Sequence, residues 1–174
     1  HWAGRLKSFP YDYLAIYSSN LNGKKSSLDI RRRYRLLSSI SSRGRVEDEL
    51  EIEFCHEGKW KELNGTFIEG QVENLVEIAL PQGTILEGVW RGDEDFSSQV
   101  EETQEGEKKI VFFHYVLNPG ECLHFKLRYL LPKVARGKWV LLFQNIKCLS
   151  KVVLFYEVRR EGEVWKEVES ILES

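Results

Sequence analysis

Four arginines fall within five residues of this sequence, at Arg31, Arg32, Arg33 and Arg35, directly after a loop rich in Asn, Ser, Gly and Lys. Guanidinium groups recognise phosphate and carboxylate groups through paired N–H donors. If the chain from Ile30 is extended, Arg31, Arg33 and Arg35 point to one face about 7 Å apart, a spacing that suits successive phosphates or an acidic polysaccharide. The first hypothesis for this run is therefore an anion-binding face.

The next predicted strand offers these arginines a structural role instead. Its sequence VEDELEIEF places Leu50, Ile52 and Phe54 on one face and three glutamates on the other, namely Glu49, Glu51 and Glu53. A turn at Arg43-Gly44 would bring the two strands together antiparallel, and opposite charges across strands contribute roughly 0.2–1 kcal/mol per pair. We expect this cross-strand ladder to account for the arginine run, with anion binding as the alternative.

Nucleic acid is not an expected partner of this chain. Lys and Arg total 25 against 27 for Asp and Glu, so the overall field does not attract polyanions. The basic residues also lack the interleaved aromatic side chains on which single-stranded bases stack.

The loop that precedes the arginines is the second candidate site, and it contains Asn20, Asn22, Gly23, Lys24 and Lys25. Backbone amides around a glycine can hold an anion, but Asn and Gly also tolerate the left-handed backbone that a turn requires. We favour the turn. Anion binding by this loop together with Arg31, Arg33 and Arg35 stays as the alternative.

No spacing of residues predicts a metal site, a cofactor site or a catalytic set. His56, His114 and His124 lie on separate predicted strands, and we expect them to be solvent-facing or hydrogen-bonded. The carboxylates from Asp93 to Glu107 belong to a polar segment whose simplest role is solvation. We expect no enzyme, although an active site built on Asp93, Glu94 and Asp95 is a third hypothesis.

The three cysteines, Cys55, Cys122 and Cys148, lack the close spacings of zinc ligands, and their odd number does not complete a disulfide framework. Free Cys behaves as a small apolar residue. We therefore expect buried thiols, with a Cys122–Cys148 disulfide as the alternative.

The periodicity of the whole chain is that of β-strands separated by turn residues. About nine or ten strands are expected, a number that suits an antiparallel, immunoglobulin-like β-sandwich, with a barrel as the alternative. The segments KWVLLFQNI and KVVLFYEVRR are expected to form the last strand pair, and a short C-terminal helix is favoured over a strand from Val164. One domain covers residues 1–174. Because the sequence begins HWAG and contains no Met, we expect it to be a fragment of a longer protein.

Several short motifs follow one another between Trp2 and Gln144: HWAG, DYLAIYSSNLNGKKSSLDIRR, GRVEDELEIEF, LPQGTILEG, NPGECLHFKLRYLLP and WVLLFQ. In this order they resemble the C-terminal β region of an uncharacterised family of bacterial membrane-anchored cell-surface proteins, a domain of unknown function. The residues that carry the resemblance are Trp2, Gly4, Asp12, Asn20, Gly23, Lys24, Arg31, Pro81, Gly83, Thr84, Pro119, Gly120, Glu121, Tyr129 and Pro132. Thr84 stands where the family has Ser. Asn145-Ile146 stands where, in the family, a Pro-Gly pair tends to follow the late Gln.

The resemblance implies a module outside the cytoplasm, tethered to the cell membrane through N-terminal sequence absent from this chain. Its expected partners are other domains of the same longer protein, with a cell-envelope polysaccharide as an alternative partner. The leading hypothesis is a non-catalytic β-sandwich that supports or positions a neighbouring envelope-associated domain. The alternative is a binding module for an anionic envelope glycan or polymer, through the Asn20–Lys25 loop and the Arg31–Arg35 face.

Overall fold

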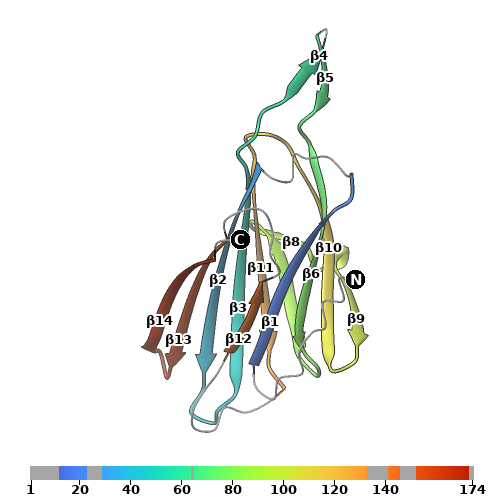
Figure 1. Cartoon of the computed structure of the whole chain (residues 1–174). Coiled ribbons are helices and arrows are strands. Elements are labelled where there is room, and N and C mark those ends of the chain that lie inside the picture. The colour runs from blue at the N-terminus through green and yellow to red at the C-terminus, as the bar shows by residue number, and fades with distance from the viewer. Residues whose placement is uncertain (1–11, 23–28, 64, 133–140, 146–151, 173–174) are drawn as a thin grey trace.

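The computed structural model describes residues 12–22, 29–63, 65–132, 141–145 and 152–172 (Figure 1). Within these ranges lie fourteen β-strands, the short 3₁₀ helix Ser97–Gln99 and no α-helix. The strands form two large sheets and one separate two-stranded hairpin. The expected all-β sandwich is confirmed.

The larger sheet has seven strands in the order β14-β13-β2-β3-β11-β7-β8 (Figure 1). Their bounds are β2 Ile30–Ile40, β3 Val46–His56, β7 Ile85–Arg91, β8 Glu94–Asp95, β11 Cys122–Leu130, β13 Val152–Arg160 and β14 Glu163–Leu172. The turn between β2 and β3 is closed by a hydrogen bond from the Gly44 amide to the Ser41 carbonyl. Gly44 has a φ of 77°, a conformation that glycine adopts without strain, so the predicted hairpin is confirmed.

The smaller sheet has five strands in the order β12-β1-β6-β10-β9. Their bounds are β1 Asp12–Asn20, β6 Val72–Pro81, β9 Glu101–Glu105, β10 Lys108–Leu117 and β12 Leu141–Asn145. The strand β9 forms an edge of this sheet, and its side chains are all exposed. Its charged side chains hinder pairing of this edge with another chain.

Aromatic side chains join the two sheets in the core. Phe54 of the larger sheet stacks on Tyr115 of the smaller sheet with ring centroids 4.6 Å apart. Phe125 lies at the same centroid distance, 4.6 Å, from Phe113. Burial of each such side chain stabilises the fold by about 1.5–3 kcal/mol. These contacts hold the inner faces of the two sheets together. The opposite face of the larger sheet carries its charged residues.

A hairpin made of β4 (Lys61–Leu63) and β5 (Thr66–Glu69) projects from one end of the sandwich (Figure 1). His56 lies at its base and is buried. Its Nδ1 atom accepts a hydrogen bond from the Gly58 amide at 3.0 Å, and its Nε2 atom contacts the Gly70 carbonyl at 2.5 Å. Because Nδ1 accepts, Nε2 carries the proton and donates. One side chain therefore ties together the two segments that lead into and out of the hairpin.

The structure corrects several sequence-based expectations. The strands number fourteen in the described ranges, rather than nine or ten, because β4, β5, β8 and β9 are short edge or hairpin strands without apolar alternation. The C-terminal segment is the strand β14 and not a helix, since backbone pairing with β13 decides between the two patterns. The strands β12 and β13 do not pair with each other: β12 is parallel to β1, and β13 is parallel to β2. The sandwich is therefore antiparallel except at these two pairs.

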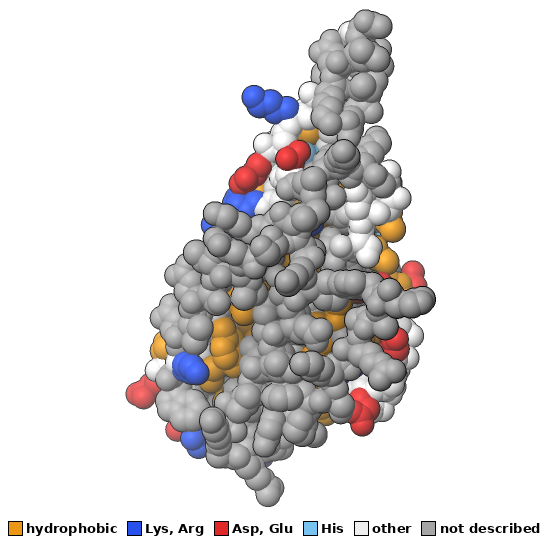
Figure 2. All heavy atoms as spheres, viewed as in Figure 1, with side chains coloured by type: hydrophobic (Ala, Val, Ile, Leu, Met, Phe, Trp, Pro, Cys, Tyr) orange, Lys and Arg blue, Asp and Glu red, His pale blue; other side chains and the backbone are white. Residues whose placement is uncertain are grey.

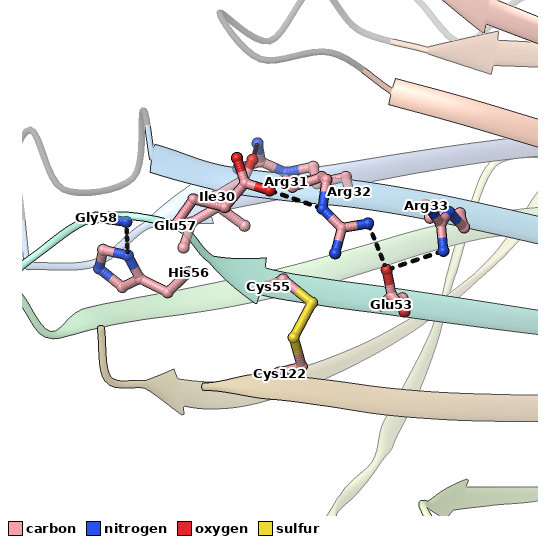
Figure 3. Close-up of polar contacts among 10 residues, drawn as sticks. All are labelled: Ile30, Arg31, Arg32, Arg33, Glu53, Cys55, His56, Glu57, Gly58 and Cys122. Atoms are coloured by element: carbon pink, nitrogen blue, oxygen red, sulfur yellow. Dashed lines mark hydrogen bonds and ion pairs between the residues drawn. A yellow bond between two sulfur atoms is a disulfide. The ribbon is translucent and has the colours of Figure 1, made fainter. Parts of the chain in front are cut away.

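The expected buried thiols at Cys55 and Cys122 are also wrong, because the two residues form a disulfide (Figure 3). They lie directly opposite each other on β3 and β11, with Cα atoms 4.1 Å apart. The alternative Cys122–Cys148 bridge is overturned by the same bond, and Cys148 itself lies outside the described residues. Only the register of two strands that are 67 residues apart in sequence brings these sulfur atoms together.

Candidate functional site

The outer face of the larger sheet carries three neighbouring columns of charged side chains. The middle column is the glutamate column of β3, and the arginines of β2 flank it on one side. The side chains of β11 that point to this face flank it on the other side, namely His124, Lys126 and Arg128. Such columns follow from the period of two along each strand, which sends the apolar residues inward and the charged ones outward.

The arginines and glutamates of β2 and β3 form the predicted ladder. Arg33 lies opposite Glu53, and Arg35 lies opposite Glu51. The corresponding N···O distances are 3.5 Å and 3.3 Å. Arg31 lies opposite Cys55, but its side chain reaches Glu53 at 2.9 Å and Glu57 at 2.8 Å (Figure 3). The cross-strand interpretation of the arginine run is therefore confirmed.

Glu53 is the centre of this charge network. Its carboxylate contacts Arg31 at 2.9 Å, Arg33 at 3.5 Å and the Nδ1 atom of His124 at 3.8 Å. Its side chain is 19% exposed, against 48% for that of Arg33. Partial burial among three basic groups strengthens these pairs relative to exposed ones.

Arg32 points the opposite way from its three neighbours. It is buried with the core-facing residues of β2 and donates a hydrogen bond from Nη1 to the Ile30 carbonyl at 3.1 Å. Its position follows from the strand period, as the alternation of the segment predicted. Arg32 is therefore not part of the charged outer face.

The sequence analysis did not single out the column on β11 as part of this charged outer face. Arg128 donates to Glu49 at 2.6 Å, and this contact raises the pKa of Arg128 above its ordinary value. The cationic groups of Lys126 and Arg128 each lie 5.5 Å from the centroid of the Trp90 ring on β7, within cation–π distance. The alternation HFKLRY in the sequence carried this signal, but only the pairing of β11 with β3 places the three columns side by side.

A hollow of about 520 Å³ lies over the middle of this outer face. Its charged lining comes from Arg33, Arg35, Glu51, Glu53, His124 and Lys126. Phe155 of β13 adds an aromatic side chain, and Gly92 lies in the turn that follows β7. The volume falls within the range of small-ligand sites, so this hollow is the candidate site.

The Asn20–Lys25 loop does not join the hollow through its described residues. The Oδ1 atom of Asn20 accepts a hydrogen bond from the Asn22 amide at 3.1 Å, which is the local turn that was favoured over anion binding. The Asn22 side chain donates to the Gln71 carbonyl at 3.0 Å and so ties the loop to the start of β6. Gly23, Lys24 and Lys25 lie outside the described residues.

The acidic segment from Asp93 to Glu107 is exposed over almost its whole described length. Asp93, Glu94 and Asp95 face solvent, and a hydrogen bond from the Ser97 amide lowers the pKa of Asp95. None of these three carboxylates lines the hollow. An active site in this segment would need carboxylates held in a pocket, so the structure gives no support to that hypothesis.

The three histidines of the described residues have separate surroundings. His56 is buried at the base of the hairpin, His114 contacts Glu73 at 3.0 Å on the smaller sheet, and His124 borders the hollow. Within the described ranges, no group of three His, Cys, Asp or Glu residues is placed to hold a metal ion.

On the face that Figure 2 shows, basic and acidic side chains of the described residues lie in small groups, and neither sign forms a continuous patch. Among the residues that the structure describes, no helix has the length and apolar character that crossing a bilayer would require.

No family model matches the chain, and no curated protein matches it. Similar solved structures include an M1 zinc metallopeptidase from Deinococcus radiodurans, at a TM-score of 0.39 and 12% identity, with 76% of this chain and 32% of that chain covered. Another is described as a "putative nutrient binding protein" from Legionella pneumophila, at a TM-score of 0.43 and 11% identity, with 84% of this chain and 53% of that chain covered. The chain thus spans about a third and about half of these two proteins. Similarity at this level supports neither a shared family nor a shared function.

Proposed function

We propose that this chain is a non-catalytic β-sandwich module that works outside the cytoplasm as part of a longer, membrane-anchored bacterial surface protein. In this proposal residues 1–174 form one domain, which supports or positions a neighbouring envelope-associated domain. The sequence motifs that resemble such surface proteins give the setting, and the structure adds a physical reason for it.

The Cys55–Cys122 disulfide is the observation that carries the proposal. Disulfides persist in oxidising compartments outside the cytoplasm and are rare inside it, where thiols are kept reduced. Cys55 is buried next to the hydrogen-bonded base of the hairpin. The bond therefore fixes β3 to β11 at the end of the sandwich from which the hairpin projects.

The charged outer face supports a structural rather than a catalytic role. The carboxylates of Glu49, Glu51 and Glu53 are each held by an arginine. General acid–base catalysis needs a group with access to the proton that it transfers, and each of these carboxylates is instead engaged by an arginine. The base of the hairpin, which is hydrogen-bonded through His56, suits an element that spaces or orients a neighbour.

Two measurements test the proposal. Peptide mapping of the protein exported to an oxidising compartment is expected to recover Cys55 and Cys122 as one disulfide-linked pair, unreactive to alkylating reagent before reduction. The purified module is expected to turn over no glycan or phosphoester substrate. Alkylation of both cysteines in the exported protein, or turnover that disappears in Glu53→Gln, would contradict the proposal.

A second candidate function is a binding module for an anionic cell-envelope glycan or polymer. The hollow favours it, because Arg33 and Arg35 line a concave surface of ligand size. A salt-sensitive shift of amide resonances around the hollow, on addition of an acidic envelope polymer, would support this function. Unchanged spectra with every such polymer would remove it.

A further inference from the structure

The hollow on the outer face of the larger sheet has more basic than acidic lining. Arg33, Arg35 and Lys126 face the two carboxylates of Glu51 and Glu53. The charge of Glu53 is also offset by Arg31, which approaches it at 2.9 Å. Arg31 also pairs with Glu57, and Arg35 also lies 3.9 Å from Glu157. The excess of positive charge therefore belongs to the groups that line the hollow, whereas the face as a whole is a ladder of ion pairs.

Of the two arginines that line the hollow, Arg33 has the weaker internal contact. Among the described residues its ion pair is a single Nη1 contact with Glu53 at 3.5 Å, and its side chain is 48% exposed. A guanidinium has five N–H donors in a planar fork that matches a carboxylate. Most of the donors of Arg33 are thus available to a ligand in the hollow.

Lys126 and Glu51 supply a neighbouring donor and acceptor. They lie directly opposite each other on β11 and β3. Within the described part of the chain, the ammonium group of Lys126 lies near the Trp90 ring at 5.5 Å and has no ion pair with a carboxylate. Glu51 is 44% exposed and contacts Arg35 through one oxygen. A hydroxyl group can accept a hydrogen bond from an ammonium and donate one to a carboxylate.

Phe155 adds an apolar surface to this polar lining. It is half-buried on β13 and lies opposite Arg35 of β2. Small-ligand sites combine apolar contact area with a few convergent polar groups that fix orientation. The hollow therefore offers a cation for one carboxylate, donors and acceptors for hydroxyl groups, and an aromatic side chain for a ring.

We propose that the hollow binds a small hydroxylated monocarboxylate of the uronic acid type. Arg33 pairs with the carboxylate, Lys126 and Glu51 bind hydroxyl groups, and Phe155 contacts the ring. This inference rests on the second candidate function, and it names the ligand class and the residues that recognise it.

A titration of isotope-labelled protein with glucuronate, followed through amide resonances, tests this site. Saturable shifts are expected for residues of β2, β3 and β11 around the hollow. Glucose, which lacks the carboxylate, and acetate, which lacks the hydroxyl groups, are expected to bind at least about tenfold more weakly, corresponding to the loss of one charge-assisted contact of about 1.4 kcal/mol.

Two matched variants complete the test. Arg33→Gln is expected to weaken glucuronate binding about tenfold. Arg128→Gln removes an arginine of similar exposure from the same face, outside the hollow, and is expected to leave the affinity unchanged. Absence of saturable shifts, equal binding of glucose or acetate, or equal effects of the two variants would overturn the inference. None of these results depends on the disulfide or on turnover, so failure of the site is distinguishable from failure of the proposed module function.

Discussion

Asp48 places a carboxyl group in the core, and from its burial we predict an unusual pH dependence of stability. It lies on the inward face of β3 and is fully buried. Its strand neighbours are Ser38 on β2 and Tyr129 on β11. Neither oxygen of the Asp48 carboxyl accepts a hydrogen bond of good geometry from a described residue. Burial raises the pKa of Asp48 to about 7, and the negative charge of Glu47 acts in the same direction. The nearby hydroxyl groups of Ser38 and Tyr129 act in the opposite direction and are outweighed.

The magnitude follows from the difference between the folded and unfolded states. The ordinary pKa of this carboxyl is 3.8, against about 7 in the fold, so at pH 8 ionisation lowers the free energy of unfolding by about 4 kcal/mol. Between these two values the folded state binds more protons than the unfolded chain. The free energy of unfolding therefore falls as pH rises through this window, and about 3 kcal/mol of the loss lies between about pH 5 and pH 8.

Asp48→Asn removes the ionisation while keeping the size of the side chain. The difference in free energy of unfolding between the variant and the wild type is expected to shift by about 3 kcal/mol in favour of the variant between about pH 5 and pH 8. Urea denaturation followed by tryptophan fluorescence measures it at each pH. Using the pH-dependent difference cancels any constant cost of burying the amide.

Asp93→Asn is the matched control, because Asp93 is exposed. Its difference from the wild type is expected to be the same at both pH values. If the Asp48→Asn difference were also independent of pH, Asp48 would not be a neutral buried acid in the fold, and the reasoning would be refuted.

Three further perturbations have defined outcomes. Replacing Cys55 and Cys122 by Ala opens a loop with a sequence separation of 67 residues, and the free energy of unfolding is expected to fall by about 3–4 kcal/mol in denaturant titrations. Glu53→Gln leaves Arg31 and its basic neighbours without their shared anion, so unfolding is expected to become easier by about 1 kcal/mol in the same assay. His56→Ala removes both side-chain hydrogen bonds at the base of the hairpin, and a loss of about 2–4 kcal/mol is expected, with faster amide hydrogen exchange at Gly58.

Each of these expectations has an outcome that would contradict it. The double Cys variant should match the reduced wild type, and a difference between them would mean that the disulfide is not the cause. Glu94→Gln changes an exposed carboxylate outside the network and should have little effect on the free energy of unfolding. An equal loss in this variant would show that Glu53 is not the centre of the charge network. Unchanged exchange at Gly58 in His56→Ala would show that the imidazole does not tie the hairpin base.

Much of the larger sheet is readable from local sequence. The alternation of apolar and charged residues from Val46 to Phe54 fixes which side of β3 is buried, because side chains of a strand alternate between two faces. Gly44 marks the hairpin, and the short connection makes β2 and β3 antiparallel neighbours. From these features alone the cross-strand contacts of Arg33 and Arg35 follow.

Other features depend on contacts between distant segments. The alternation of β14 suits both a helix and a strand, and pairing with β13 decides it. The parallel pairs of β12 with β1 and of β13 with β2 join segments separated by most of the chain, and no local signal specifies them. The short strands β8 and β9 lie in an acidic segment whose sequence predicts a loop. An edge strand needs no apolar face, so these strands lack the alternation that would reveal them.

The order of residues is enough to predict that most strands have one apolar face, and that the arginines of β2 meet glutamates across a hairpin. Strand periodicity and a short turn act between near neighbours, so they are visible in the residue order. The position of β11 on the other side of the glutamates is set by the folded chain, and it brings Cys122 to Cys55 and Lys126 to the hollow. That register is set by packing the whole core, and its information is distributed over residues that are far apart in the chain.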